Sequence, residues 1–344
     1  MNSRIAIFVW SLSLAACASL PAPVTVISTS ETAASARRGE TPGSPAIWVG
    51  RGSPEPGLVG SGFVASTSRA DGLILRDLQG SVLQRVTGAH LADLDVAAMP
   101  LEEGYSVILG GPERISGRTR LVLFRLDRGS DQTVRRWAEI ATDLVEPAGF
   151  CMRQSRGVVH AVAIDRRGEA RQFTVAEGPA GEPSLKESRR FRISQSGQGC
   201  AIEPGDRYVY FSHAREGFWR YRLDPSANAE PTWLRASAPH ALPRSTGVSF
   251  LTDRDGRYLT TLDQDRVAFS VWRLGSRDVT WLGHFEVREQ PDGRAVRTVA
   301  GMDAYGADLG PFPNGIVVVQ DQANADSPNL KYIDWAAVRR ALRF

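Results

Sequence analysis

Oxygen-bearing side chains gather near the C-terminal end of this 344-residue chain. Asp303 lies in a glycine-rich loop, and the β-branched segment Ile316–Val319 runs directly into Gln320, Asp321 and Asn324. Carboxylate and amide oxygens held at the end of a rigid strand are the ligands that calcium prefers. We therefore expect these four polar residues to hold a structural calcium ion. The alternative is that Asp321 and Asn324 only form a polar turn.

The strands that must position these groups follow a repeated pattern. Helical periodicity is nearly absent, and short strands bounded by Gly, Pro, Asp and Ser recur throughout. An apolar strand with an aromatic residue or an arginine, followed by a polar turn, occurs at Leu73–Leu78, Leu121–Asp127, Ala170–Val175, Phe218–Asp224, Phe269–Gly275 and Leu330–Trp335. Successive copies lie roughly 50 residues apart, a period that suits four-stranded propeller blades.

This repeat predicts an all-β fold, a six-bladed β-propeller over residues 43–344. The alternative is a β-sandwich, which rarely repeats at so even a spacing. Asp334–Arg343 could form a short C-terminal helix on the outside. Because a propeller joins its first and last blades in one sheet, we expect the strand Ser44–Val49 to pack near the C-terminus.

The first residues resemble an export signal. Arg4 precedes the apolar segment Ile5–Leu14, and Leu14-Ala15-Ala16-Cys17 looks like a bacterial lipobox, whose cysteine becomes lipidated. We expect a lipoprotein signal peptide at 1–16, lipidation of Cys17 and a flexible tether at 17–42. Ala18 after the cysteine favours the outer membrane. The alternative is an ordinary signal peptide that happens to contain a cysteine.

Composition excludes little beyond nucleic-acid binding. The chain has 41 Lys and Arg against 38 Asp and Glu, a net charge of +3, without a long basic run. Cys151 and Cys200 could form a disulfide in an exported protein. The alternative is two buried thiols, which suit their apolar strand contexts.

The sequence lacks the motifs of several common enzyme classes. The sequence contains no G-x-S-x-G, P-loop or dinucleotide fingerprint. The five histidines are scattered without metal-ligand spacing.

Several short motifs occur in the order seen in the β-propeller phytases. The segments that resemble that family are Pro45–Val49, Asp71–Gly80, Ala92–Val96, Ala148–Cys151, Gly197–Gly199 and Gly301–Trp335. The resemblance implies a propeller fold and the calcium-dependent hydrolysis of phosphomonoesters of myo-inositol hexakisphosphate (phytate). In that reaction, carboxylate-held calcium ions bridge the phosphates and activate a water molecule.

At several positions where the family has acidic residues, this chain has other residue types. The replaced positions are Gln198, His213, Arg244, Thr246 and Ala300. A cation where an acid held calcium opposes metal binding by charge repulsion. The resemblance therefore leaves catalysis uncertain, and we expect the 3-phytase-type activity to be weak or lost.

The family's basic phosphate contacts are better kept. The candidates are Arg69, Arg114, Arg166 (or its neighbour Arg167) and Arg244. Guanidinium groups bind phosphate without a metal.

Three hypotheses follow for this chain. It is a weak phytase with structural calcium, a metal-free propeller that binds an anionic ligand or partner, or an envelope scaffold. We expect a monomer whose ligand is a phosphorylated small molecule such as an inositol phosphate. We do not expect it to bind nucleic acid.

Overall fold

The computed structural model describes residues 20–33, 42–50, 58–68, 72–127, 132–193, 199–205, 207–214, 216–226, 230–242, 245–289, 293–297, 299, 301–322 and 328–344. Nearly all regular structure in this part of the chain is β-strand, as the sequence predicts. The only α-helices described are α1 (Leu58–Ser61) and α2 (Trp335–Leu342), and a 3-10 turn covers Pro239–Ala241.

The strands form four four-stranded sheets and one nine-stranded sheet. The first three four-stranded sheets run in chain order. They are β3 (Pro42–Trp48), β4 (Phe63–Ser68), β5 (Gly72–Arg76) and β6 (Val82–Val86); β7 (Asp95–Pro100), β8 (Tyr105–Ile115), β9 (Arg118–Leu126) and β10 (Val134–Thr142); and β11 (Pro147–Ser155), β12 (Val158–Asp165), β13 (Glu169–Glu177) and β14 (Pro183–Arg192).

The nine-stranded sheet contains two antiparallel runs and one added strand. The runs are β15 (Cys200–Ile202), β16 (Tyr208–His213), β17 (Gly217–Arg222) and β18 (Thr232–Ala236), then β19 (Ser245–Asp253), β20 (Gly256–Asp263), β21 (Ala268–Leu274) and β22 (Asp278–Arg288). The added strand β1 (Val24–Ile27) pairs parallel with β22. The last sheet consists of β23 (Met302–Tyr305), β24 (Ile316–Asp321), β25 (Asn329–Asp334) and β2 (Ser30–Glu31).

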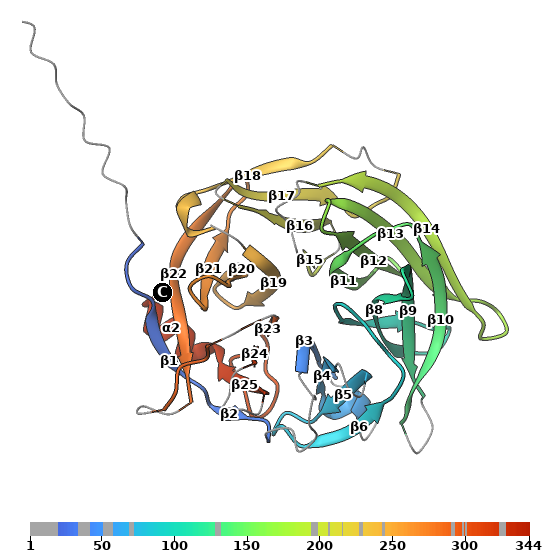
Figure 1. Cartoon of the computed structure of the whole chain (residues 1–344), viewed down its shortest axis with the longest axis horizontal. Coiled ribbons are helices and arrows are strands. Elements are labelled where there is room, and N and C mark those ends of the chain that lie inside the picture. Colours follow the sequence, from blue (N-terminus) through green and yellow to red (C-terminus); the bar gives the residue numbers. More distant parts are fainter. Residues whose placement is uncertain are drawn as a thin grey trace, which may run out of the picture.

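The sheets are arranged as a ring around a central axis, which identifies the fold as a β-propeller (Figure 1). The inner strand of each run contacts the next inner strand in the order β3, β7, β11, β15, β19 and β23, and β23 contacts β3 again, so the ring is closed. The apolar cores lie between neighbouring sheets. The six repeated sequence segments fall on β5, β9, β13, β17, β21 and β25, the third strand of each run along the chain.

Burial on both faces explains why these strands are apolar along their length. In β24, Ile316 and Val318 pack toward the β3–β6 sheet, whereas Val317 and Val319 pack toward β19–β22. Side chains of a strand alternate between the two faces of its sheet. A strand covered by neighbours on both sides therefore needs apolar residues at every position.

The expected tether at 17–42 is wrong for residues 20–33. These residues include β1, which pairs alongside β22, and β2, which completes the last sheet beside β25. Val26 is buried in the core, and the fully buried Nζ of Lys331 on β25 contacts Glu31. Backbone pairing and this ion pair hold the segment against the propeller. Residues 1–19, with Cys17 and the signal segment, and residues 34–41 lie outside the described part.

The ring closure also differs in detail from the expectation. The strand that joins the C-terminal sheet is β2, not Ser44–Val49. β3 contains most of that segment and is the inner strand of its own sheet, where it contacts β23 and β24 of the neighbouring sheet. Both ends of the chain therefore meet at this boundary, but a shorter and earlier strand makes the shared sheet.

The expected C-terminal helix is confirmed as α2. The side chain of Asp334 caps it by accepting a hydrogen bond from the Ala336 N–H at 2.9 Å. Leu342 lies over Gly283 of β22, where a Cβ would come within 2.7 Å of its side chain. Gly283 also has φ +140°, so the site requires glycine on both grounds.

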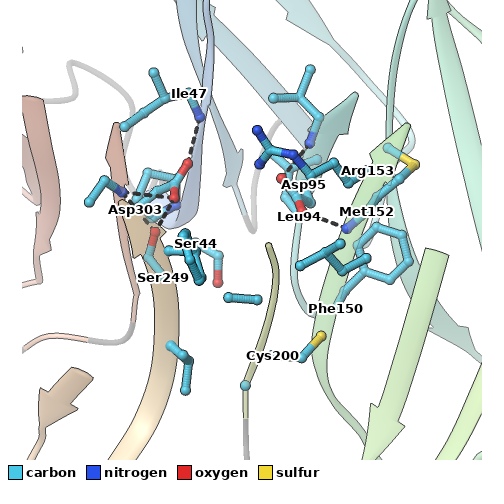
Figure 2. A pocket seen from close by; sticks show the side chains of 18 of the residues that line it. Ser44, Ile47, Leu94, Asp95, Phe150, Met152, Arg153, Cys200, Ser249 and Asp303 are labelled. Atoms are coloured by element: carbon cyan, nitrogen blue, oxygen red, sulfur yellow. Dashed lines mark hydrogen bonds between the residues drawn. The ribbon is translucent and has the colours of Figure 1, made fainter. Parts of the chain in front are cut away.

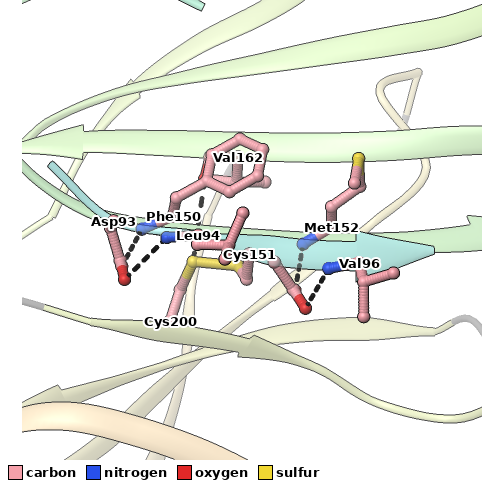
Figure 3. Close-up of a disulfide and its surroundings, with 9 residues drawn as sticks. Asp93, Leu94, Val96, Phe150, Cys151, Met152, Val162 and Cys200 are labelled. Carbon is pink, nitrogen blue, oxygen red and sulfur yellow. Dashed lines mark hydrogen bonds between the residues drawn. A yellow bond between two sulfur atoms is a disulfide. The ribbon is translucent and has the colours of Figure 1, made fainter. Parts of the chain in front are cut away.

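Cys151 and Cys200 form a disulfide that joins β11 to β15 (Figure 3). Their Cα atoms lie 5.6 Å apart, and both residues are buried. Of the two alternatives left open by the sequence, the disulfide is therefore the one observed, and it links the inner strands of neighbouring sheets.

Candidate functional site

A cavity of about 1010 Å³ follows the central channel and is lined by the inner strands (Figure 2). Its lining includes residues at or near the start of those strands, such as Ser44, Pro147 and Gly301, and also their last residues, such as Trp48 and Tyr305. We call the face at which the inner strands begin the front face.

Two aspartates of the β7 segment line this cavity and bond to the adjacent inner strand. Asp93 accepts hydrogen bonds from the Phe150 N–H at 2.7 Å and the Leu94 N–H at 3.0 Å. Asp95 accepts from the Met152 N–H at 2.6 Å and the Val96 N–H at 2.7 Å. Each carboxylate therefore joins β7 to β11.

Asp303 on β23 makes the corresponding connection elsewhere in the ring. It accepts hydrogen bonds from the Ile47 N–H of β3 at 2.9 Å and from the Ser249 hydroxyl of β19 at 2.6 Å (Figure 2). Its own neighbour Ala304 also donates a backbone N–H at 2.8 Å. Asp303 thus contacts the inner strands on both sides of β23.

The position of these carboxylates follows from the edges that a propeller leaves at its centre. An inner strand pairs on one side only, and its unpaired N–H groups need acceptors. The three aspartates supply them. This arrangement explains the carboxylates structurally, without a bound ion.

The same arrangement disfavours the ionised form of the aspartates. Burial, with the charge of Asp303 as a smaller contribution, raises the pKa of Asp95 to about 8. Burial raises the pKa of Asp93 to about 6, although hydrogen bonds from Ser44 and the backbone oppose the shift. Burial also raises the pKa of Asp303, against hydrogen bonds from Ser249 and Ile47. Near neutral pH these carboxyl groups therefore hold protons that ordinary aspartates would have released.

Four of the sequence-predicted residues lie at the front face. Arg114, Arg166, His213 and Asp321 stand at or next to the ends of the second strands β8, β12, β16 and β24, which run antiparallel to the inner strands. The topology therefore brings residues from distant segments to one end of the channel.

The arginines differ in how they relate to the cavity. Arg166 is exposed and lines the cavity, where Arg153 of β11 is also found. Arg114 is exposed at the end of β8 but does not line it. Beside it, the fully buried Glu113 accepts hydrogen bonds from Arg120 and Arg136. His213 lies with its Nδ1 3.1 Å from Glu216.

Several predicted site residues lie outside the described residues. They are Arg69, Gln198, Arg244, Ala300 and Asn324, together with the side chain of Thr246. The backbone of Thr246 belongs to β19, which begins at the front face.

The residues predicted to share one calcium ion fall into two groups. Asp303 pairs with Val318 and so lies on the face opposite to Met302 and Ala304, which pack toward β19–β22. Its carboxylate lies at the edge of the sheet, where it still reaches Ser249 of β19. Asp321 follows the alternation of Val319 and points toward the β19–β22 side. Asp303 and Asp321 thus alternate onto opposite faces of one sheet. The single calcium site stays a prediction, and this arrangement favours Asp321 over Asp303 as its ligand.

A smaller donor set remains around Asp321. Asn329 lies directly opposite it on β25 and is buried. The Asn329 amide donates to Glu31 and to the Thr32 carbonyl, while its Oδ1 has no hydrogen-bond partner. A buried carbonyl oxygen beside a carboxylate suits a hard cation. Among the described residues, however, no three His, Cys, Asp or Glu side chains group as metal ligands.

Sequence reasoning missed Asp93, Asp95 and Arg153 as residues of the channel. The segment Ala92–Val96 was noted only for its resemblance to a family motif, and neither aspartate was assigned to the site. The available signal was the placement of two acids two residues apart at the start of an otherwise apolar strand, which puts both on one face.

The model of the family described as Phytase matches residues 3–343. The chain is 23% identical over 313 residues to the 3-phytase of Bacillus subtilis (strain 168), covering 87% of this chain and 80% of that protein.

Solved structures agree on the fold. A structural genomics protein of unknown function from Bacteroides thetaiotaomicron superimposes with a TM-score of 0.55 at 11% identity, covering 91% of this chain and 75% of that one. The Aleuria aurantia lectin, a six-bladed β-propeller, gives 0.51 at 10% identity, covering 74% and 81%. No described helix is long and apolar enough to span a bilayer.

Proposed function

Because this chain belongs to the Phytase family, we propose that it is a phytase-type propeller that binds a phosphorylated small molecule and hydrolyses it weakly or not at all. The ligand class is an inositol phosphate or a similar anion. The observation that carries the proposal is the distribution of charge between the channel and the front face.

The described acids lie in the channel, which Arg153 also lines, whereas Arg166 lies at the front face. The carboxylates of Asp93, Asp95 and Asp303 accept backbone N–H groups inside the channel, so part of their coordinating capacity is already used. Arg166 is exposed at the front of the same cavity. Arginine can hold a phosphate group without a metal. Efficient hydrolysis needs several cations held by carboxylates, which the replaced positions no longer supply.

We assign six blades to the propeller. The nine-stranded sheet divides naturally at β18–β22, where only two residue pairs connect two antiparallel runs of four strands. Counting these runs separately gives six repeats of four strands, with β2 completing the last and β1 added outside β22.

A structural calcium ion at the last blade is part of the proposal. Asp321 and Asn329 are the described candidates, and Asn324 follows Asp321 closely in the sequence. Gln320 also belongs to the proposed ligand set, although it alternates onto the face of Val318, opposite to Asp321. Asp303 belongs to the channel and would serve a separate ion or none.

The proposed location is the bacterial outer membrane, with residues 1–16 removed and Cys17 lipidated. Cys17→Ser should release the protein from the membrane fraction or leave it unprocessed. A variant that fractionates and migrates like wild type would refute the anchor.

The binding proposal is tested by titrating phytate into the protein in the presence of EDTA. We expect calcium-independent binding that weakens steeply with salt, since exposed charges are screened over about 8–10 Å. Arg166→Ala should weaken it by about 1.5–3 kcal/mol. Arg167→Ala is the matched control, an exposed neighbour that does not line the cavity. Equal effects of both variants would show that only diffuse charge attracts the ligand.

Absence of any phosphate binding would leave the scaffold as the alternative function. The observation behind this alternative is that each described channel carboxylate already has a structural role.

A further inference from the structure

The N-terminal segment is fixed to the propeller from Leu20 onward. Leu20 packs against an apolar cluster between β15–β18 and β19–β22. The Pro21 carbonyl lies 2.7 Å from Nε2 of the buried His284 on β22. Beyond it, β1 pairs with β22 from Val24 to Ile27, and the Ser28 N–H donates to the Arg288 carbonyl at 2.8 Å. The segment from Leu20 to Ser28 is therefore held against the propeller along its length.

This attachment leaves very little chain between the propeller and Cys17. Only Ala18 and Ser19 separate Cys17 from Leu20. Three Cα–Cα steps of about 3.8 Å reach at most about 11 Å. A lipid on Cys17 would therefore hold the side of the propeller at Leu20 close to the bilayer surface.

The C-terminal helix meets the chain at the same place. Leu342 of α2 lies over Gly283, the residue before His284, and α2 contacts both β1 and β22. We call this side, formed by β1, α2, Arg343 and Phe344 over β22, the α2–β1 rim. Figure 1 shows it at the outside of the ring, opposite β10.

The exposed charge of the rim suits an anionic lipid surface. Arg340 and Arg343 are exposed, whereas Arg339 is engaged with Asp253 and Asp255. Basic residues beside a membrane attachment point are attracted to anionic headgroups within a Debye length.

We propose that the α2–β1 rim lies against the membrane, with the propeller standing on its side. The inference rests on the proposed lipid anchor at Cys17. The channel then runs along the membrane surface, so that the front face opens sideways and stays accessible to a soluble ligand.

The test uses the full-length lipidated protein in vesicles of phosphatidylethanolamine and phosphatidylglycerol that carry a headgroup quencher. A fluorophore is attached to Arg340→Cys on the rim or to Arg135→Cys on β10, an exposed arginine on the opposite side. Cys151 and Cys200 are bonded to each other and do not compete for the label. We expect several-fold stronger quenching at position 340 than at position 135.

A Gly-Ser segment inserted between Ser19 and Leu20 is the matched control. It should abolish the difference in quenching while the protein still floats with the vesicles. Equal quenching at both positions in the floating protein without the insertion would overturn the proposed orientation and leave the anchor intact. Failure to float, with Cys17→Ser behaving like wild type, would overturn the anchor and the orientation with it.

Discussion

The carboxylate of Asp95 on β7 accepts a hydrogen bond from the Met152 N–H on β11 at 2.6 Å. The residue before Met152 is Cys151, whose disulfide to Cys200 joins β11 to β15 (Figure 3). A carboxylate and a disulfide thus join three consecutive inner strands at neighbouring positions. The stability of the ring should therefore depend on the protonation state of Asp95.

Stability should fall as the pH rises from about 5 to 8. The pKa of Asp95 is raised to about 8 and that of Asp93 to about 6, whereas an unfolded aspartate titrates near about 3.9. Between these values the folded protein binds more protons than the unfolded chain. The free energy of unfolding then decreases with pH, by up to about 1.4 kcal/mol per unit for each group. Urea unfolding at several pH values measures this slope.

Asp95→Asn removes one titrating group and should make the slope between pH 6 and 8 shallower. The comparison concerns the slope, because the amide also changes a hydrogen bond and so alters stability at every pH. Asp308→Asn, at an exposed aspartate, is the control and should leave the slope unchanged. An identical slope in wild type and Asp95→Asn would show that Asp95 ionises as an ordinary aspartate.

Loss of the disulfide should destabilise the propeller without altering its fold. The bond closes a loop with a sequence separation of 49 residues between two inner strands. Replacing both cysteines by serine should cost about 2–4 kcal/mol in the free energy of unfolding. A thiol reductant should lower the melting temperature of wild type only. A reductant effect of equal size on the double variant would assign it to another cause.

Lys331 should stabilise the pairing of β2 with β25. Its Nζ is fully buried and contacts Glu31 and Glu289, so Lys331→Ala removes the cation that holds β2 to β25. We expect a loss of about 3–5 kcal/mol and faster hydrogen exchange at Ser28–Thr32. Lys186→Ala, at the only other lysine of the chain, is the control. Unchanged exchange in Lys331→Ala would mean that backbone pairing alone holds the segment.

Calcium should raise the melting temperature through Asp321 and Asn329. At a concentration one hundred times the Kd the gain is about 2.7 kcal/mol. Asp321→Ala should abolish the gain and Asn329→Ala should reduce it, because both residues lie on one face of the last sheet. Asp303→Ala should leave the calcium-dependent shift in place. If calcium does not raise the melting temperature of the wild type, the loop at Asp321 is only a polar turn.

The fold could be predicted from the sequence because its signal repeats. Each third strand carries the same apolar pattern, so β5 and β25 are recognisable although they lie far apart in the chain. The position of β1 and β2 could not be predicted in the same way. Residues 20–33 are polar or small for the most part, and their partners lie hundreds of residues away.

The candidate site was only partly predictable. Strand order places Arg166 and Asp321 at the same face, which follows from the topology alone. The separation of Asp303 from Asp321 depends on the register of β23 against β24. A shift by one residue exchanges the two faces, and no pattern in the loop before β23 specifies that register.

The most direct test of the account is phosphate release from phytate in saturating calcium, measured beside the 3-phytase of Bacillus subtilis. We expect background release by this protein, under conditions in which it still binds phytate. Calcium-dependent turnover at a rate close to that of the relative would contradict it.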